Sequence, residues 1–387
     1  MINHYSFFNC PGFYPGVLND YFQITLSYSQ ITIQMKMQEI MSYKINANCR
    51  KFSMILSLML VCLCGRSQYN FSEVDKLLAP NQQSKDQLVA LIYKDGKILY
   101  KKEMGEEFTL KSKAPIANSS SWLTAALVMT FVDEGKISLD DKVSTYIPIF
   151  ETYGKSFITI RQCLSHQTGI ADNQKLVAKL LEKRKFESLE DEVNSYAKKE
   201  IAANPGTSFF YGDMGLNIAG RVLEVVSKKR FDILAKQRLF TPLNMKNSSF
   251  TPEDNAVNPS GGAVSSAGDY LNFLTMILDK GTFMGKRVLS EAAVKEMQTI
   301  QTNSKTIKKY VPKGMEGNEY GLGEWIAGTG ANTLISCPAL NGTFPYIDNC
   351  RKYAFILFTK DISGEQAKAL QTQIKTAIDR QITGACN

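Results

Sequence analysis

The pattern of apolar and polar positions predicts a β-hairpin and then a helix in the first half of the chain. Residues 88–104, LVALIYKDGKILYKKEM, alternate apolar and polar side chains around Asp95-Gly96, and two such runs joined by Asp-Gly are a strong hairpin signal. In residues 122–134 the apolar side chains recur at helical spacing and Gly135 follows, which predicts a helix that ends at a glycine.

The remaining pattern is helical in the middle of the chain and strand-like near its end. Residues 158–243 are mainly helical in pattern, and the charged stretch at 181–200 is typical of a solvated helix face. The other predicted elements are an amphipathic segment at 71–78, a glycine-rich turn and helix at 261–282, strands at 321–327, 332–336 and 353–359, and an amphipathic helix at 364–382. We therefore expect one discontinuous sheet, built from both ends of the chain, with a helical region inserted.

An apolar run near the N-terminus is typical of a secretory signal peptide. Residues 52–64, FSMILSLMLVCLC, are too few to span a bilayer as a helix, and basic residues precede them. The alternative is a buried core helix. Because a signal peptide belongs at an N-terminus, we expect translation to start at Met35, Met37 or Met41. Residues 1–67 are then a leader, and residues 68–387 are exported to the periplasm or the cell exterior, without a membrane span of their own.

The composition is that of an ordinary globular protein, with 44% hydrophobic and 21% charged residues in 387, so disordered, collagen-like and coiled-coil chains are excluded. The leader holds five of the 45 basic and two of the 37 acidic residues, which lowers the net charge from +8 to +5 beyond it. The remaining Lys and Arg form no basic run interleaved with aromatic residues, so we expect no nucleic-acid partner. The chain has only two His, neither in a metal-ligand spacing. We expect no metal or cofactor, and a nucleophilic enzyme would need Lys, Tyr or a carboxylate as its base.

Four cysteines lie beyond the leader: Cys163, Cys337, Cys350 and Cys386. In an oxidising compartment four thiols allow three pairings, but a chain of this length does not need a bridge to fold. Two alternatives remain open and equal, namely buried free thiols or one bridge involving Cys337 and Cys350.

Several blocks in a fixed order resemble one enzyme family. They occupy residues 115–148, 158–170, 204–227, 240–250, 261–270 and 320–325. Over residues 71–382 the chain resembles the serine beta-lactamases and penicillin-binding-protein-like hydrolases, closest to the class C beta-lactamase and esterase branch. The resemblance implies an α/β protein of the α+β kind with a beta-lactamase/transpeptidase-like fold. Its antiparallel sheet would come from residues 68–116 and 262–387, with flanking helices and a mainly helical region at 117–261.

The first motif of such enzymes is Ser-x-x-Lys at the start of a helix. Residues three apart share a helix face, so the Lys amine lies beside the Ser hydroxyl and can take its proton. Alignment on the block that begins at Trp122 places Asn118 at the Ser position and Ser121 at the Lys position. An amide is no alkoxide precursor, and a Ser hydroxyl cannot replace a desolvated Lys as base. Sliding the register creates no Ser-x-x-Lys.

The second and third motifs are also altered. The resemblance places the second motif at Tyr211-Gly212-Asp213, where Tyr211 is the one intact general-base candidate and Asp213 replaces an amide. The third motif aligns on Cys337-Pro338-Ala339 and lacks the usual hydroxyl or amine. Ligand-binding candidates at this strand are Cys337, Ala339 and Leu340, and the Leu340 backbone N–H is a candidate donor to an oxyanion.

We therefore expect an exported relative of these hydrolases that is catalytically inactive and retains a cleft for a peptide, an ester or a cell-wall-like ligand. Two alternatives stay open. One is an active esterase, beta-lactamase or D-peptidase that uses Ser119, Ser120 or Cys337 as a non-standard nucleophile. The other is a structural or partner-binding protein whose cleft has closed. In the family pattern His166 stands at a helix-to-loop corner away from the chemistry, so we expect a structural histidine.

Overall fold

The computed structural model describes residues 32–39, 69–79, 87–170, 186–250, 256–302, 305–339, 342–359, 364–384 and 386. By its internal contacts the chain divides into Met1–Gln68 and Tyr69–Asn387. In the first unit, residues 32–39 form a helix with exposed side chains. The expected signal peptide at 52–64 lies outside the described residues. Of the helices in the described part of the chain, none is long and apolar enough to cross a membrane.

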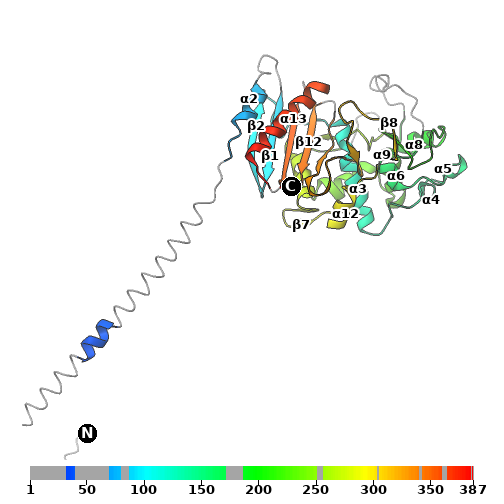
Figure 1. Cartoon of the computed structure of the whole chain (residues 1–387). Coiled ribbons are helices and arrows are strands. Elements are labelled where there is room, and N and C mark those ends of the chain that lie inside the picture. The colour runs from blue at the N-terminus through cyan, green and yellow to red at the C-terminus, as the bar shows by residue number, and fades with distance from the viewer. Residues whose placement is uncertain are drawn as a thin grey trace, which may run out of the picture. The chain divides into compact units, whose positions relative to one another are not determined.

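One seven-stranded antiparallel sheet organises the second unit, in the order β2-β1-β13-β12-β11-β10-β9. Its strands are β1 (Leu88–Lys94), β2 (Lys97–Met104), β9 (Glu319–Tyr320), β10 (Trp325–Ala327), β11 (Leu334–Ser336), β12 (Thr343–Asp348) and β13 (Tyr353–Thr359). The first two strands come from one end of the chain and the other five from the opposite end, which confirms the discontinuous sheet (Figure 1). The predicted hairpin is β1–β2, and Asp95 and Gly96 both take positive φ at its turn.

Short strands pair outside the main sheet. They are β3 (Ala114–Pro115) with β5 (Val264–Ser265), β4 (Ser208–Phe210) with β8 (Ile307–Tyr310), and β6 (Thr282–Phe283) with β7 (Lys286–Arg287). The β3–β5 pair brings the residues before the first core helix beside the glycine-rich turn at 261–262, so this pair helps to position the candidate site.

Helices cover both faces of the sheet. Those that pack on the sheet or line the candidate site are α2 (Ser72–Leu78), α3 (Ser120–Asp133), α9 (Met214–Ser227), α11 (Ala267–Leu278) and α13 (Gly364–Gln381). The others are α4 (Val143–Tyr146), α5 (Ile149–Thr152), α6 (Ile160–Leu164), α8 (Leu189–Ala197), α10 (Phe231–Ala235) and α12 (Glu291–Met297), with 3₁₀ turns η2 (Ala117–Ser119) and η4 (Gly330–Asn332) and the π-helical turn η3 (Lys236–Phe240).

The two faces of strand β1 pack in different hydrophobic clusters. Leu88, Ala90 and Ile92 of β1 belong to the cluster shared with α2 and α13, whereas Val89 and Leu91 belong to the larger cluster that contains α3, α9 and α11. In Figure 1, α2 and α13 accordingly lie together beside β1 and β2. The period of two puts successive side chains on opposite faces, so both faces of β1 are apolar and buried.

One strand prediction is wrong in part, and one strand was not predicted. The run at 321–327 forms a strand only from Trp325, because Gly321 and Gly323 form a turn between β9 and β10 and Gly323 has a φ of +76°. Strand β12 was not predicted, and it contains Pro345, a residue without a backbone N–H. The pairing of β12 with β11 begins at Tyr346, so Pro345 lies beyond the ladder and interrupts no hydrogen bond to β11.

Candidate functional site

The turn before α3 carries the residue at the predicted nucleophile position. Asn118 is the middle residue of η2, and its side chain is partly exposed. Ala117, which precedes it, has a φ of +40°. This left-handed region costs an L-residue with a Cβ roughly 1–2 kcal/mol, and such strain persists only where the surroundings enforce it. The entry to α3 at Ala117 is therefore strained, and its surroundings hold Asn118 in place.

The Asn118 side chain contacts the second motif. Its amide Nδ2 donates to the phenol Oη of Tyr211 at 3.2 Å, across 93 residues of chain. Tyr211 follows β4 and is buried, and burial raises the pKa of its phenol, with a further contribution from Cys337. A phenol acts as a general base when its surroundings favour the phenolate. Here they favour the protonated phenol.

The third motif is joined to the same turn by two hydrogen bonds. The Cys337 thiol Sγ donates to the Asn118 carbonyl at 3.2 Å, and the Ser119 hydroxyl donates to the Cys337 carbonyl at 2.6 Å. Both Cys337 and Ser119 are fully buried, and burial raises the pKa of the Cys337 thiol. We call this pair of contacts the 119–337 clamp. It attaches the segment after β11 directly to the start of α3.

The other two serines of the block also have partners. Ser121, at the Lys position, is buried and donates through Oγ to the Ser260 carbonyl at 3.1 Å. Ser120 is buried and its Oγ accepts from the backbone N–H of Ala263 at 3.0 Å. Together with Ser119, these hydroxyls hold the helix start against the third motif and the 260–263 turn.

The remaining predicted site residues lie around this contact. The backbone N–H of Ala339 donates to the Thr343 carbonyl at 2.8 Å, so this donor is already used within the chain. Leu340 lies outside the described residues. Asp213 immediately precedes α9 and is partly exposed, and its charge contributes to the raised pKa of Tyr211.

An aromatic cluster packs behind Tyr211. It consists of His166, Phe209, Tyr211, Tyr320 and Trp325. The ring of His166 is buried, and its Nε2 is 3.0 Å from the Tyr320 hydroxyl. Its ring centroid lies 4.7 Å from that of Tyr211. The expectation that His166 stands away from the site is therefore wrong, because the loop after α6 returns its ring against the second motif.

A buried carboxyl group beside α3 was missed by the sequence analysis. Glu324 is fully buried, and neither of its oxygens has a hydrogen-bond partner among the described residues. Burial raises its pKa well above the usual value, which the nearby indole of Trp122 opposes only in part. A neutral carboxyl group is therefore favoured. The available signal was a single acidic residue inside the apolar run GLGEWIA.

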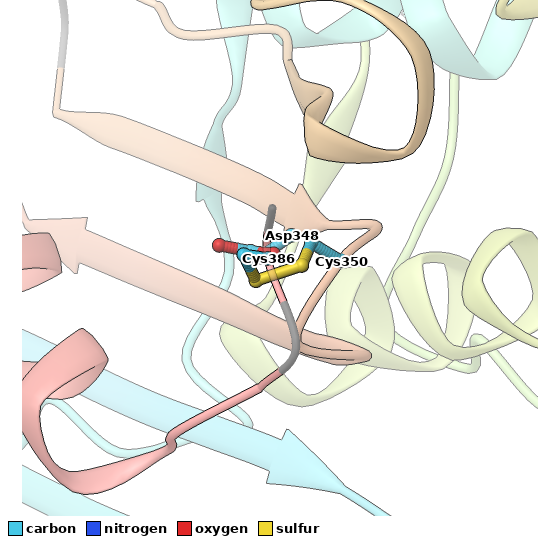
Figure 2. Close-up of side chains that lie close together, drawn as sticks. All are labelled: Asp348, Cys350 and Cys386. Atoms are coloured by element: carbon cyan, nitrogen blue, oxygen red, sulfur yellow. A yellow bond between two sulfur atoms is a disulfide. The ribbon is translucent and has the colours of Figure 1, made fainter.

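The cysteine pairing differs from the bridge considered from the sequence. Cys350 is bonded to Cys386, while Cys163 and Cys337 are free and buried. A Cys337–Cys350 bridge is therefore wrong, because Cys337 lies under α3 and Cys350 lies in the turn between β12 and β13. Figure 2 shows the bridge beside the Asp348 side chain.

The Asp348 carboxylate and the two sulfurs lie within 4.8 Å of one another, a grouping that a metal ion can in principle use. A disulfide has no thiolate to offer, and Asp348 already accepts from the Arg351 backbone N–H and from Lys375 Nζ, at 2.8 Å and 3.0 Å. These residues therefore fit a disulfide with an adjacent ion pair better than a metal site.

Comparison with known proteins gives the family of this fold and site. A penicillin-binding protein 4 of Amycolatopsis lactamdurans is 28% identical over 234 residues, which are 52% of this chain and 60% of that protein. A beta-lactamase-like protein 4 of Dictyostelium discoideum is 26% identical over 232 residues, 52% of this chain and 39% of its own length. The chain thus spans less than two thirds of the length of these relatives.

A solved structure aligns over more of the chain. The protein described as a beta-lactamase from Bacteroides dorei DSM 17855 superposes with a TM-score of 0.71 at 25% identity, over 80% of this chain and 98% of that one. The family model named Beta-lactamase matches residues 74–377. The expected motif positions also lie together at the start of α3. On the family match, this chain belongs to the beta-lactamase family.

Proposed function

We propose that the protein is a catalytically inactive, exported member of the beta-lactamase family. The observation that carries this proposal is the Asn118 amide, which stands at the nucleophile position and donates to Tyr211. Removal of the nucleophile or of its base lowers kcat of a serine hydrolase by about 10⁶. At this site the nucleophile and the Lys are both replaced.

The neighbouring hydroxyls and thiol do not favour a substitute nucleophile. Ser119, Ser120 and Cys337 are fully buried, and each is engaged in a hydrogen bond with backbone atoms. A thiol becomes a nucleophile when its pKa is lowered, and burial raises that of Cys337. The surroundings of Tyr211 likewise favour the phenol over the base.

Export is supported by two independent features. The apolar run at 52–64 with its basic flank is typical of a signal peptide. The Cys350–Cys386 bridge is typical of proteins that fold in an oxidising compartment.

Ligand binding at this site would depend on Asn118. Its side chain is partly exposed, whereas Tyr211, Ser119 and Cys337 are buried beneath it. We propose that a peptide, ester or cell-wall-like ligand is bound here through hydrogen bonds to the Asn118 carboxamide, without acyl transfer.

Intact-mass measurement after incubation with a reactive beta-lactam and with p-nitrophenyl acetate tests inactivity. We expect no covalent adduct on the wild-type chain. The double variant Asn118→Ser with Ser121→Lys supplies the missing motif, and Asn118→Ser alone is its control without the base. An adduct on the wild-type chain, mapped to any side chain at the start of α3, would contradict the proposal.

Thermal unfolding with an uncleaved acyl dipeptide tests binding without turnover, since a ligand that binds the native state raises Tm. We expect a rise for the wild-type chain that is lost in Asn118→Ala. An unchanged Tm in both proteins would favour a closed, structural role for this site. Cell fractionation followed by mass analysis of the N-terminus tests export and the leader. Recovery in the cytoplasm with residues 52–64 retained would count against export.

A further inference from the structure

A groove at the far end of α3 has the charge and size of a second binding site. It has a volume of about 820 Å³ and is lined by the last turn of α3, the end of α9, η3 and the loop between β7 and α12. Ligand sites typically measure about 300–1,000 Å³. The 14 residues of α3 place the groove about 20 Å from Asn118, at 1.5 Å per helical residue. We call it the basic groove. In Figure 1, α3 and α12 lie close together in this part of the molecule.

The acidic side chains of the basic groove already have partners. Both oxygens of Glu134 accept from the Arg238 guanidinium, at 2.7 and 2.8 Å, and Lys136 adds a second cation at 2.7 Å. These hydrogen bonds, with that of Arg238 first, lower the pKa of Glu134 to about 2. Asp133 accepts from the backbone N–H and the hydroxyl of Ser290, at 2.7 and 2.6 Å. Neither carboxylate is therefore available to the other basic residues that line the groove.

Two cations remain for a ligand. Lys229 donates to the amide oxygen of Gln237, and Arg287 donates through Nη1 to the carbonyls of Lys280 and Leu289. Among the described residues neither forms an ion pair with a carboxylate, and both are exposed. The two carbonyl contacts orient the Arg287 guanidinium, which leaves its other N–H donors for an anion. An Arg held in place loses less side-chain entropy on binding than a mobile one.

The rest of the lining is apolar and well supported. Val226, Pro242 and Val288 contribute the accessible apolar surface, and the buried Leu234 and Leu289 pack behind them. The Arg238 guanidinium carbon lies 4.1 Å from the centroid of the buried Phe131 ring, which adds a cation–π contact to its carboxylate pair. Arg238 and Gln237 belong to the π-helical turn η3, a conformation often found at functional sites.

From these features we propose that the basic groove binds an organic anion, a phosphate monoester or carboxylate with a hydrocarbon part. Lys229 and Arg287 contact the anionic group, and the apolar side chains contact the hydrocarbon. This site is independent of the acyl-transfer position at Asn118, because none of its residues takes part in the 119–337 clamp.

Isothermal titration calorimetry of the full chain with octyl phosphate at low ionic strength tests the proposal. Octyl glucoside serves as the uncharged probe and inorganic phosphate as the probe without hydrocarbon. We expect octyl phosphate to bind and both other probes to bind at least about tenfold more weakly. Octyl glucoside lacks the charge-assisted hydrogen bonds, each of which contributes roughly a factor of ten. Inorganic phosphate lacks the hydrocarbon, whose burial contributes roughly a factor of four in affinity for each CH₂ group. Added salt should weaken octyl phosphate binding.

The test variant is Lys229→Gln with Arg287→Gln, and its control is Lys228→Gln with Lys286→Gln. The control removes the same charge from the adjacent exposed positions, which do not line the groove. We expect the test variant to lose about 10- to 100-fold in octyl phosphate affinity and the control about twofold or less. All four side chains are exposed, but Arg287 also donates to two backbone carbonyls. Thermal unfolding of both variants is therefore measured first, and affinities are compared at a temperature at which both are folded.

Three outcomes would overturn the proposal. Equal binding of octyl glucoside shows that charge plays no part, and equal binding of inorganic phosphate shows that the hydrocarbon plays none. Equal affinities in the two double variants place the octyl phosphate elsewhere. Binding in the Asn118→Ala variant should match the wild type, so failure here is distinguishable from failure of the proposed function.

Discussion

At the scale of single residues, two side chains at the start of α3 carry the proposal of inactivity. Asn118 offers an amide that is already bonded to Tyr211, and Ser121 offers a hydroxyl bonded to a carbonyl. Glu324 is a third notable residue, a buried carboxyl group whose oxygens have no hydrogen-bond partner among the described residues. The first two were visible in the sequence, whereas the burial of Glu324 required the packing of the β9–β10 turn.

Replacement of Glu324 by Gln should stabilise the protein at neutral and higher pH. The folded state raises the pKa of Glu324, so the native state binds this proton more tightly than the unfolded state. Native stability then falls as pH rises above about 4.3, the ordinary Glu value, by up to about 1.4 kcal/mol per pH unit until the folded-state pKa is reached. Glu324→Gln removes that dependence.

Urea unfolding of wild type and Glu324→Gln at a series of pH values measures the difference. The difference in free energy of unfolding should be near zero in acid. It should favour the variant increasingly as the pH rises. Glu151→Gln, at an exposed position, is the control and should follow the wild type. A Glu324→Gln protein that is less stable than wild type near neutral pH would show that the carboxylate is ionised and paired.

A second prediction at this scale concerns the free thiols. Cys163 and Cys337 are buried, and burial raises the pKa of both thiols. We expect neither to react with iodoacetamide in the native protein, and both to react once denaturant is added. Peptide mapping by mass spectrometry distinguishes them from the other cysteines. If Cys337 in the folded protein were alkylated as fast as an exposed thiol, the third motif would be accessible to solvent.

At the scale of elements, α3 is held on several sides. The 119–337 clamp joins its start to the segment after β11, and the 260–263 turn bonds to Ser120 and Ser121. The β9–β10 turn packs against its first two turns through Gly323. The position of the helix start therefore depends on hydrogen bonds to the backbone and on close packing, and none of these contacts involves a Lys side chain.

Substitution of Gly323 by Ala should break this packing. A Cβ at Gly323 would lie 2.6 Å from the Ser121 carbonyl oxygen and 2.6 Å from the Ala125 Cβ, and φ is +76°. Gly96→Ala is a matched control, because φ is +80° there and no atom lies within 4 Å of the added Cβ. Overpacking costs about 1–3 kcal/mol, so Gly323→Ala should be less stable than Gly96→Ala by that amount in chemical unfolding. Equal losses would mean that the β9–β10 turn shifts freely.

At the scale of the whole molecule, the sheet joins the two ends of the second unit. Strand β1 pairs with β13, so residues 88–94 lie beside residues 353–359. The Cys350–Cys386 bridge fastens the chain after α13 to the β12–β13 turn, with a sequence separation of 36. The C-terminal helix is therefore held both by its apolar face and by a covalent bond.

Removal of this bridge should destabilise the whole unit. A bridge that closes a loop of this length lowers the entropy of the unfolded state and so stabilises the folded state by about 4 kcal/mol. The variant Cys350→Ser with Cys386→Ser should therefore lose up to that amount of free energy of unfolding in urea. Dithiothreitol should destabilise the wild type to a similar degree and leave the double variant unchanged. A double variant as stable as the oxidised wild type would mean that the bridge contributes nothing to folding.

Local signals in the sequence were sufficient for the elements whose boundaries depend on neighbouring residues. The β1–β2 turn follows from Asp95-Gly96, and α3 ends before Gly135, which has a φ of +65°. The apolar and polar pattern did not predict a strand whose formation depends on pairing with distant segments. Strand β12 contains Pro345 and forms because β13 pairs along its full length while β11 pairs only beyond the proline.

The candidate site divides in the same way. The sequence by itself determined which functional groups are present: an amide at 118, a hydroxyl at 121, a phenol at 211 and a thiol at 337. Only the tertiary structure decided that the Asn118 amide donates to Tyr211, that His166 packs on the same ring, and that Cys386 and not Cys337 pairs with Cys350. The physical reason is that chemical identity is local to a residue. Burial, pKa and pairing depend on which distant segments the sheet and its helices bring into contact.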